Sequence, residues 1–415
     1  MEYLNFMLYL ICVVYAYRKK CSLVFKALSS LWALCSFIGI FYYHSTAYKE
    51  GLNSLSLFPF LFLFVCWLIC VSPFNKVEKK QINFEQLFKE LPFVKSILLF
   101  ISISAYPVFI ELCYILISSI FSGRIFLMAE NYDDLANGYS DRLFALSKVS
   151  EFCFHIGLYF QVISPLLLLL YINVKKKNIF IIGGLIASSL IVPLYSICSG
   201  SRTGLVFFAL YLTILYLFLY NKINEAINVK LRKFFIIGGS IFVSILIMLT
   251  VGRFVLGSNY DSDDIGGSLY VYTSESMYNF NTMASQTSKN THGLYSFTPI
   301  EQRLGISPIS NISKRRDYLR SRMDISAIWF YTFVGDFCID FGYLGSFIII
   351  ILLSLIFRQL IKGKITLFKL SLIGLYLYIV SNGIFYFPFQ SGDSALVGCL
   401  VIALIAFLSQ KRFAR

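Results

Sequence analysis

The feature that most constrains this chain is a series of long apolar runs that recurs from one end of the sequence to the other. Each run has about 20 residues, enough for a helix to cross a bilayer core about 30 Å thick. Inside lipid the backbone must satisfy its own hydrogen bonds, and an open sheet cannot do so, which predicts helical spans. The eleven predicted spans lie near residues 2–17, 23–43, 55–72, 96–119, 152–173, 179–198, 204–220, 234–256, 335–357, 370–389 and 394–410.

The composition agrees with this interpretation. Hydrophobic residues make up 58% of the 415 positions and charged residues 14%, and the mean hydropathy is +0.73. Soluble domains carry about 25% charged residues, so this chain has the composition of a membrane protein. We therefore predict an all-α polytopic membrane protein that forms a single multi-span domain over residues 1–415.

Lysine and arginine are unevenly divided between the two sides of the predicted domain. Of the 36 Lys and Arg residues, 23 fall in alternate connections, which include Arg18–Lys20, Lys175–Lys177 and the carboxyl-terminal tail. Short loops rich in these residues stay in the cytoplasm. The amino terminus is therefore predicted outside and the carboxyl terminus inside. The net charge of +14 then reflects topology and anionic lipid, and no nucleic-acid partner is expected.

The ten cysteines lie within or at the ends of the predicted spans. Their spacing offers neither a disulfide framework nor paired metal ligands, so we expect small core side chains and no metal or other cofactor. The amino-terminal segment lacks a basic leader and a small-residue cleavage site. It is therefore predicted to be a retained first span rather than a signal peptide.

Two outer connections are long, residues 121–151 and residues 257–334. The second separates the eighth and ninth predicted spans, and loops of this length are usually functional or disordered. Its last part, NISKRRDYLRSRMDIS, has the pattern of a short helix with Ser313 as its amino-terminal cap. The arginines of this helix are Arg315, Arg316, Arg320 and Arg322.

A single arginine, Arg202, stands between two apolar runs in the stretch CSGSRTGLVFF. The small residues before it expose backbone N–H groups at the start of the next helix. A helix amino terminus together with a guanidinium group is suited to binding phosphate. The alternative is an arginine that anchors a helix end at the membrane surface. Arg253 belongs to the same outer face.

Two carboxylates, Asp336 and Asp340, lie at the outer start of the ninth predicted span. They are four residues apart and therefore share one helix face with Thr332. Ionisable residues at membrane depth usually face a cavity or a partner, and the arginines of the long loop are the obvious partners. The alternative is a salt bridge that only holds the loop in place.

Other ionisable residues are weaker candidates, because each alone is more often structural. They are Glu111, Glu151, His155, His292 and Asp393.

The chain has SGSRTGL at the start of a span, then a long outer loop, and then TFVGDFCIDFGYLGSFI. This order resembles that of the Wzy-type O-antigen or capsular repeat-unit polymerases. The resemblance implies a GT-C-like helical fold and a metal-independent glycosyltransferase of the bacterial inner membrane. Its donor and acceptor would be glycans on undecaprenyl pyrophosphate, joined at the periplasmic face. A chain-length regulator is a further partner that the resemblance suggests.

The resemblance also implies that outer arginines engage the pyrophosphate. This role would fall to Arg202 and to the arginines of the late loop, with Arg253 as a further candidate. Some relatives carry an arginine in the last outer turn, where this chain has FPFQSGDSA, with Gln390 before Asp393.

The acceptor hydroxyl needs a base within hydrogen-bond reach. The candidates are Asp336, Asp340, His292 and Asp393. We expect Asp336 to pair with an arginine, which leaves Asp340 or His292 for the proton transfer.

Two other functions remain as alternatives. An O-antigen ligase uses a similar donor and typically has a histidine followed by an asparagine near the end of its long loop, whereas His292 lies well before the loop closes. A repeat-unit flippase usually has more spans, shorter loops and charges at the centres of its spans.

Overall fold

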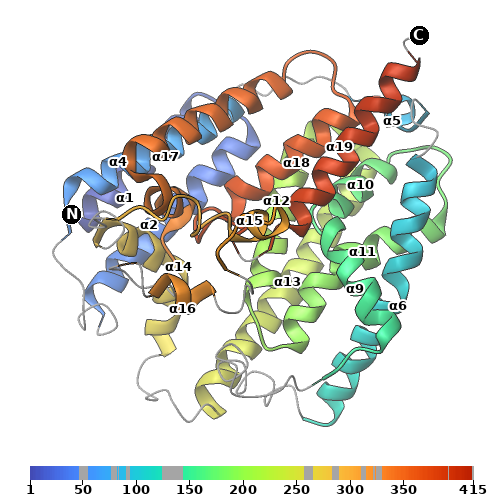
Figure 1. The fold of residues 1–415 in the computed structure, drawn as a ribbon, viewed down its shortest axis with the longest axis horizontal. Coiled ribbons are helices and arrows are strands. Elements are labelled where there is room, and N and C mark those ends of the chain that lie inside the picture. The colour runs from blue at the N-terminus through green and yellow to red at the C-terminus, as the bar shows by residue number, and fades with distance from the viewer. Residues whose placement is uncertain are drawn as a thin grey trace. The chain divides into compact units, whose positions relative to one another are not determined.

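The computed structural model describes residues 1–45, 55–75, 82, 84–89, 94–123, 144–256, 265–282, 289–309, 315–320, 323, 330–390 and 392–413. Within these ranges every regular element is a helix, so the prediction of an all-α chain is confirmed (Figure 1). In chain order the helices are α1 (Glu2–Arg18), α2 (Leu23–His44), α4 (Leu57–Val71), η1 (Ser72–Phe74), α5 (Phe84–Lys89), α6 (Val94–Phe121), α9 (Lys148–Phe160), α10 (Ile163–Tyr171), α11 (Ile179–Cys198), α12 (Thr203–Leu219), η2 (Tyr220–Lys222), α13 (Glu225–Leu256), α14 (Ile265–Thr282), α15 (Thr298–Arg303), α16 (Arg315–Arg320), α17 (Thr332–Leu360), α18 (Leu367–Asn382) and α19 (Ser394–Phe413).

Several of these helices are suited to crossing a membrane. Seven in the described part of the chain are long and apolar enough. An eighth span forms if α9 and α10 count as one, although the chain bends by 75° between them. Three predicted spans are shorter helices of 16 to 20 residues here, namely α1, α18 and α19. A multi-pass membrane protein is therefore confirmed, and the number of eleven spans stays a prediction.

The chain divides into two compact units. The first contains Met1–Glu78, Gly266–Lys364 and Tyr376–Asp393. The second contains Lys79–Ile265, Ile365–Leu375 and Ser394–Arg415.

In the first unit α1 packs against α2, and α4 packs against α17 (Figure 1). A helix from the long connection, α14, completes this core with the fully buried side chains of Met277, Tyr278 and Phe280. Gly39 of α2 makes room for Tyr278, because a Cβ atom there would lie 2.4 Å from the tyrosine ring. The sequence indicated a helix only at the end of this connection, so α14 is an element that hydropathy did not predict.

Helix α17 is broken at Gly342, where φ is 67° and ψ is −178°. This backbone conformation is almost confined to glycine. Before the break, Thr332–Asp340 are all buried. After it, the helix exposes apolar side chains such as Leu344, Ile348 and Leu352, as a lipid-facing helix does. The glycine thus separates a buried half-helix that carries Asp336 and Asp340 from an apolar span.

In the second unit α6, α9 and α11 pack around Val108, Leu112 and Ile191. Gly184 lets α11 approach α6 closely, because an added Cβ atom would lie 2.1 Å from Cβ of Ser102. Small residues at such contacts are typical of membrane helices.

Candidate functional site

The buried half of α17 is held by the turn that follows α18. The N–H of Thr332 donates to O of Phe385 at 2.9 Å, and the N–H of Phe333 donates to O of Gly383 at 2.8 Å. Thr332 has a φ of 65°, which is unusual for a β-branched residue and identifies a strained position. The first turn of α17 is therefore positioned by residues about 50 places later in the chain.

Asp336 lies fully buried in this half-helix. Its Oδ2 accepts a hydrogen bond from the N–H of Phe387 at 2.5 Å. Its Oδ1 has no hydrogen-bond partner among the described residues. A buried carboxylate oxygen without a partner is costly in a fold, so Oδ1 is available to a ligand.

Asp340 is one turn further along α17, and both of its oxygens are occupied. Oδ1 accepts from Oγ1 of Thr291 at 2.6 Å and from the N–H groups of Gly293 at 3.0 Å and Tyr295 at 2.9 Å. Oδ2 accepts from the N–H of Ser296 at 2.8 Å. The carboxylate therefore holds the loop 291–296 in place. This geometry favours a structural role for Asp340 over the proton transfer that we expected from the sequence.

His292 belongs to the same loop and is exposed. Its φ of 52° lies in the left-handed region, and its N–H donates to O of Asp340 at 3.0 Å. The loop therefore presents the imidazole on its outer side, while the backbone faces the carboxylate.

Arg315, from the amino-terminal end of α16, is buried near Asp336. Its Nη2 donates to O of Tyr295 and, at 3.3 Å, to Oε1 of Gln390. The guanidinium also lies over the Tyr295 ring, 4.9 Å from the ring centre. Arg315 and Asp336 interact electrostatically, as expected for an arginine of the late loop. Gln390, from the segment that follows α18, is thus a partner of Arg315.

Two buried tyrosines complete the group, Tyr295 and Tyr331, with ring centres 6.4 Å apart. Burial raises the pKa of Tyr295 well above its ordinary value, and the negative charge of Asp336 adds to this effect. Both phenols therefore stay neutral and can donate hydrogen bonds. We call Asp336, Arg315, Tyr295, Tyr331 and Gln390 the Asp336 cluster.

Asp393 forms a salt bridge with Arg303. Nε and Nη2 of Arg303 lie 2.6 and 2.8 Å from its two oxygens, so the pair is bidentate. Asp393 is buried, whereas 43% of the Arg303 side chain is exposed. Arg303 was not singled out from the sequence, because an isolated arginine in TPIEQRLG carries no spacing signal. Glu275 of α14 was also missed.

No described contact joins the other arginines predicted to bind phosphate to the Asp336 cluster. Arg202 is the amino-terminal cap of α12 in the second unit, next to Gly200 with its φ of 69°. The backbone of Arg253 lies in α13, and those of Arg316 and Arg320 lie in α16, but their side chains are outside the described part. Arg322 lies outside the described residues altogether.

Glu111 has a local role in the second unit. Its two oxygens accept hydrogen bonds from N and Oγ of Ser147, each at 2.7 Å, and so tie α6 to the start of α9. Glu151 and His155 lie in α9. Among the described residues, no three His, Cys, Asp or Glu side chains come together as a metal site would require.

Comparison of the chain with models of protein families, with curated proteins and with solved structures found no match.

Proposed function

We propose that this chain is a metal-independent glycosyltransferase that polymerises oligosaccharide repeat units linked to undecaprenyl pyrophosphate, as Wzy-type enzymes do. In this proposal the protein has a GT-C-like fold and lies in the bacterial inner membrane with its amino terminus in the periplasm. Its donor and acceptor are both lipid-linked glycans. The motifs around Arg202 and Asp336, and the one-sided distribution of Lys and Arg, support the proposal.

The observation that carries the proposal is the Asp336 cluster. It places a buried arginine beside a carboxylate that keeps one oxygen without a partner. Charged groups at this depth in a membrane protein are costly and usually functional. Asp336 lies on a half-helix that ends at a glycine break, and broken helices commonly line binding sites in membrane proteins.

The chemistry of polymerisation fits such a group. When the glycosyl–phosphate bond breaks, negative charge accumulates on the departing pyrophosphate, and a prepositioned guanidinium stabilises it. Arg315 is held by Tyr295 and Gln390, so it needs little reorganisation for this role. Asp336 orients polar groups of the sugar through its unpartnered oxygen. As a separate expectation from the sequence, Arg202 of the second unit is proposed to bind phosphate through its two parallel N–H groups.

The test has a cellular and a biochemical part. Deletion of the gene is expected to leave a surface glycan with a single repeat unit. Loss of a ligase or a flippase would leave none, so that result would contradict the proposal. Purified wild-type protein is expected to extend lipid-linked repeat units without added metal.

In the same assay Arg315→Ala is expected to lower turnover by about 100-fold or more, the usual effect of removing one charge-stabilising donor. Arg358→Ala is the matched control. It removes an arginine of the same unit whose Nη2 donates to Oγ of Ser72 at 2.9 Å, away from the Asp336 cluster. Equal activity of the two variants would exclude Arg315 from the reaction.

A further inference from the structure

Helix α14 has an unusual number of polar side chains for a helix that packs into a core. Oγ of Ser274 donates to O of Cys35 at 2.7 Å, and Oγ of Ser276 donates to O of Ile384 at 2.5 Å. Nδ2 of Asn279 donates to O of Phe330 at 3.2 Å. Asn281 exchanges two hydrogen bonds with the backbone of Ser56. These side chains tie α14 to four separate segments of the first unit.

Glu275 is the exception on this helix. No hydrogen bond or ion pair within the described part of the chain engages its carboxylate. The side chain is partly exposed, unlike that of Asp336. Burial raises the pKa of Glu275 to about 8, and no hydrogen bond or opposite charge counteracts this effect. A carboxylate without a hydrogen-bond or ion-pair partner, on a helix whose Ser274, Ser276, Asn279 and Asn281 side chains are all bonded, has no evident structural role.

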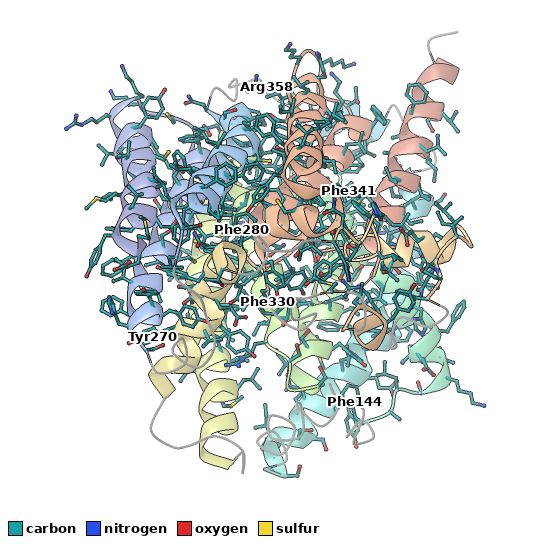
Figure 2. All side chains as sticks on the ribbon, turned by 60° about the vertical axis from the view of Figure 1, so that its left-hand side comes forward. Phe144, Tyr270, Phe280, Phe330, Phe341 and Arg358 are labelled. Atoms are coloured by element: carbon teal, nitrogen blue, oxygen red, sulfur yellow. The ribbon has the colours of Figure 1, made fainter. Side chains whose placement is uncertain are left out.

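The position of Glu275 follows from its spacing on the helix. Glu275 and Asn279 are four residues apart and lie on one face of α14. Because Asn279 bonds to Phe330, this face is turned toward the segment that leads into α17. Figure 2 labels one residue from each side of this contact, Phe280 of α14 and Phe330 of the segment that leads into α17. The next residue, Tyr331, interacts electrostatically with Glu275 and with Asp336.

Close packing holds α14 against α17 at the same place. A Cβ atom on Gly335 would lie 2.9 Å from Cδ2 of Phe280, so only glycine permits this approach. Gly335 directly precedes Asp336. Glu275 therefore approaches the Asp336 cluster from a different helix, and Tyr331, a member of the cluster, interacts electrostatically with both carboxylates.

We infer that Glu275 is the general base of the polymerase reaction, which makes it a catalytic residue that the sequence did not reveal. This inference rests on the proposed function. The acceptor hydroxyl gives its proton to the Glu275 carboxylate, and its oxygen forms a bond to the anomeric carbon of the donor. The bond from that carbon to the phosphate oxygen breaks, and its electron pair leaves with undecaprenyl pyrophosphate. Glu275 then releases its proton to water.

The other carboxylates of the unit are less suited to this step. Asp340 already accepts four hydrogen bonds, and Asp393 is held by Arg303. Asp336 is fully buried, and the proposed function assigns its unpartnered oxygen to orienting the sugar rather than to the proton transfer. A general base must reach the substrate and works best with a pKa near the working pH. The Glu275 side chain is partly exposed, and burial around its carboxylate raises the pKa to about 8.

The experiment compares Glu275→Gln with wild type in the polymerisation of lipid-linked repeat units by the purified protein. Glu275→Gln is expected to lower kcat by about 100-fold or more, with KM changed less than about threefold. Glu301→Gln is the matched control, because Glu301 is another partly exposed glutamate of the same unit. Unchanged elution and thermal unfolding of both variants would show that they fold.

A pH profile provides the readout that a structural role would not change. Wild-type turnover is expected to rise with pH through an apparent pKa near 8, and Glu275→Asp is expected to move this limb. Titratable groups on elements packed against α14 include Tyr331, Asp336, Cys35, Tyr42, Tyr43 and Tyr343. Infrared difference spectra are expected to show a protonated carboxyl group that titrates in this range. The signal should disappear in Glu275→Gln and persist in Glu301→Gln.

The outcomes separate the two proposals. If wild type polymerises and Glu275→Gln stays within about threefold of it, Glu275 is not the base, while the proposed function stands. Absence of the titrating carboxyl signal would also overturn the inference. If wild type extends no lipid-linked glycan, the proposed function fails and the inference fails with it.

Discussion

Asp336 and Asp340 are the same residue type, one helical turn apart on α17, yet their oxygens are used differently. Asp340 accepts hydrogen bonds from one hydroxyl and three backbone N–H groups, whereas Asp336 keeps Oδ1 without a partner. Asp393 is paired with an arginine, and Glu275 has no hydrogen-bond or ion-pair partner within the described chain. At the scale of single residues, the availability of an oxygen, rather than the residue type, separates structural from reactive carboxylates.

Asp340→Asn is expected to destabilise the protein by about 2–4 kcal/mol, because the amide nitrogen would face N–H donors that now meet an oxygen. Thermal unfolding of the purified variant measures the effect. Asp336→Asn, which loses no accepted bond if its amide oxygen faces Phe387, is expected to unfold near the wild-type temperature. A variant Asp340→Asn with normal stability and no turnover would instead support a role in proton transfer.

Glu275 is expected to make stability depend on pH. Its pKa in the folded protein is about 8, above the ordinary value of 4.5, so the folded state binds the proton more tightly than the unfolded state. Stability is therefore greatest at acid pH and falls as the pH rises from about 4.5 to about 8. The loss is a few kcal/mol at most, about 1.4 per pKa unit before allowance for partial exposure.

Thermal unfolding of wild type and Glu275→Gln at about pH 5.5 and about pH 9 measures this dependence. The variant is expected to lose less stability than wild type between the two conditions. Parallel curves for the two proteins would show that Glu275 titrates normally.

Arg202 allows a separate test of phosphate binding. Arg202→Lys keeps the charge but loses the two parallel N–H groups, so a deletion strain carrying it is expected to make a shortened glycan ladder. Arg202→Ala is expected to be worse, with normal membrane levels of both variants. Full ladders from both would mean that Arg202 only anchors the end of a helix.

At the scale of elements, the break in α17 explains how one predicted span contains both charged and lipid-facing parts. The buried half is tied to the turn after α18 and to the loop 291–296, and the apolar half begins after Gly342. Helix α14 is the other element that shapes the site. Its polar residues bond to four segments that are far apart in sequence.

Gly342→Ala is expected to lower stability by about 1–3 kcal/mol, because a Cβ atom disfavours the left-handed φ at this position. The cost comes from backbone strain, since the new atom would lie 3.5 Å from Nδ2 of Asn290, an ordinary contact. Gly238→Ala in α13 is the control. That glycine has open space and an ordinary φ, so alanine there is expected to be neutral or slightly stabilising. Equal unfolding temperatures for the two variants would contradict this explanation.

At the scale of the whole molecule, the chain forms two compact units, each with its own packed helices. The Asp336 cluster, Glu275 and the Arg303–Asp393 pair all belong to the first unit, and Arg202 belongs to the second. The distribution of Lys and Arg predicts which ends of these helices face the cytoplasm.

Topology is tested by introducing single cysteines. Lys289→Cys, exposed and in the long connection, is expected to react with a membrane-impermeant thiol reagent in cells whose outer membrane is permeable. Lys176→Cys, also exposed, is expected to react only after the inner membrane is opened. The native chain, whose ten cysteines are buried or partly buried, measures the background. The reverse labelling pattern would overturn the predicted orientation.

The helical, multi-pass character and the sidedness of charge could be predicted from the sequence, because hydropathy and charge add up locally within each segment. Asp336, Asp340 and Arg315 could also be selected there as candidate site residues, because they are charges beside apolar runs. Only the tertiary structure decided which of the carboxylates keep an oxygen without a hydrogen-bond partner. Asp340 is bound by residues 44 to 49 positions away, Asp336 by one 51 away, and Asp393 by one 90 away. Such partners leave no periodic pattern, and so Arg303 and Glu275, whose surroundings come from packing, had no signal in the sequence.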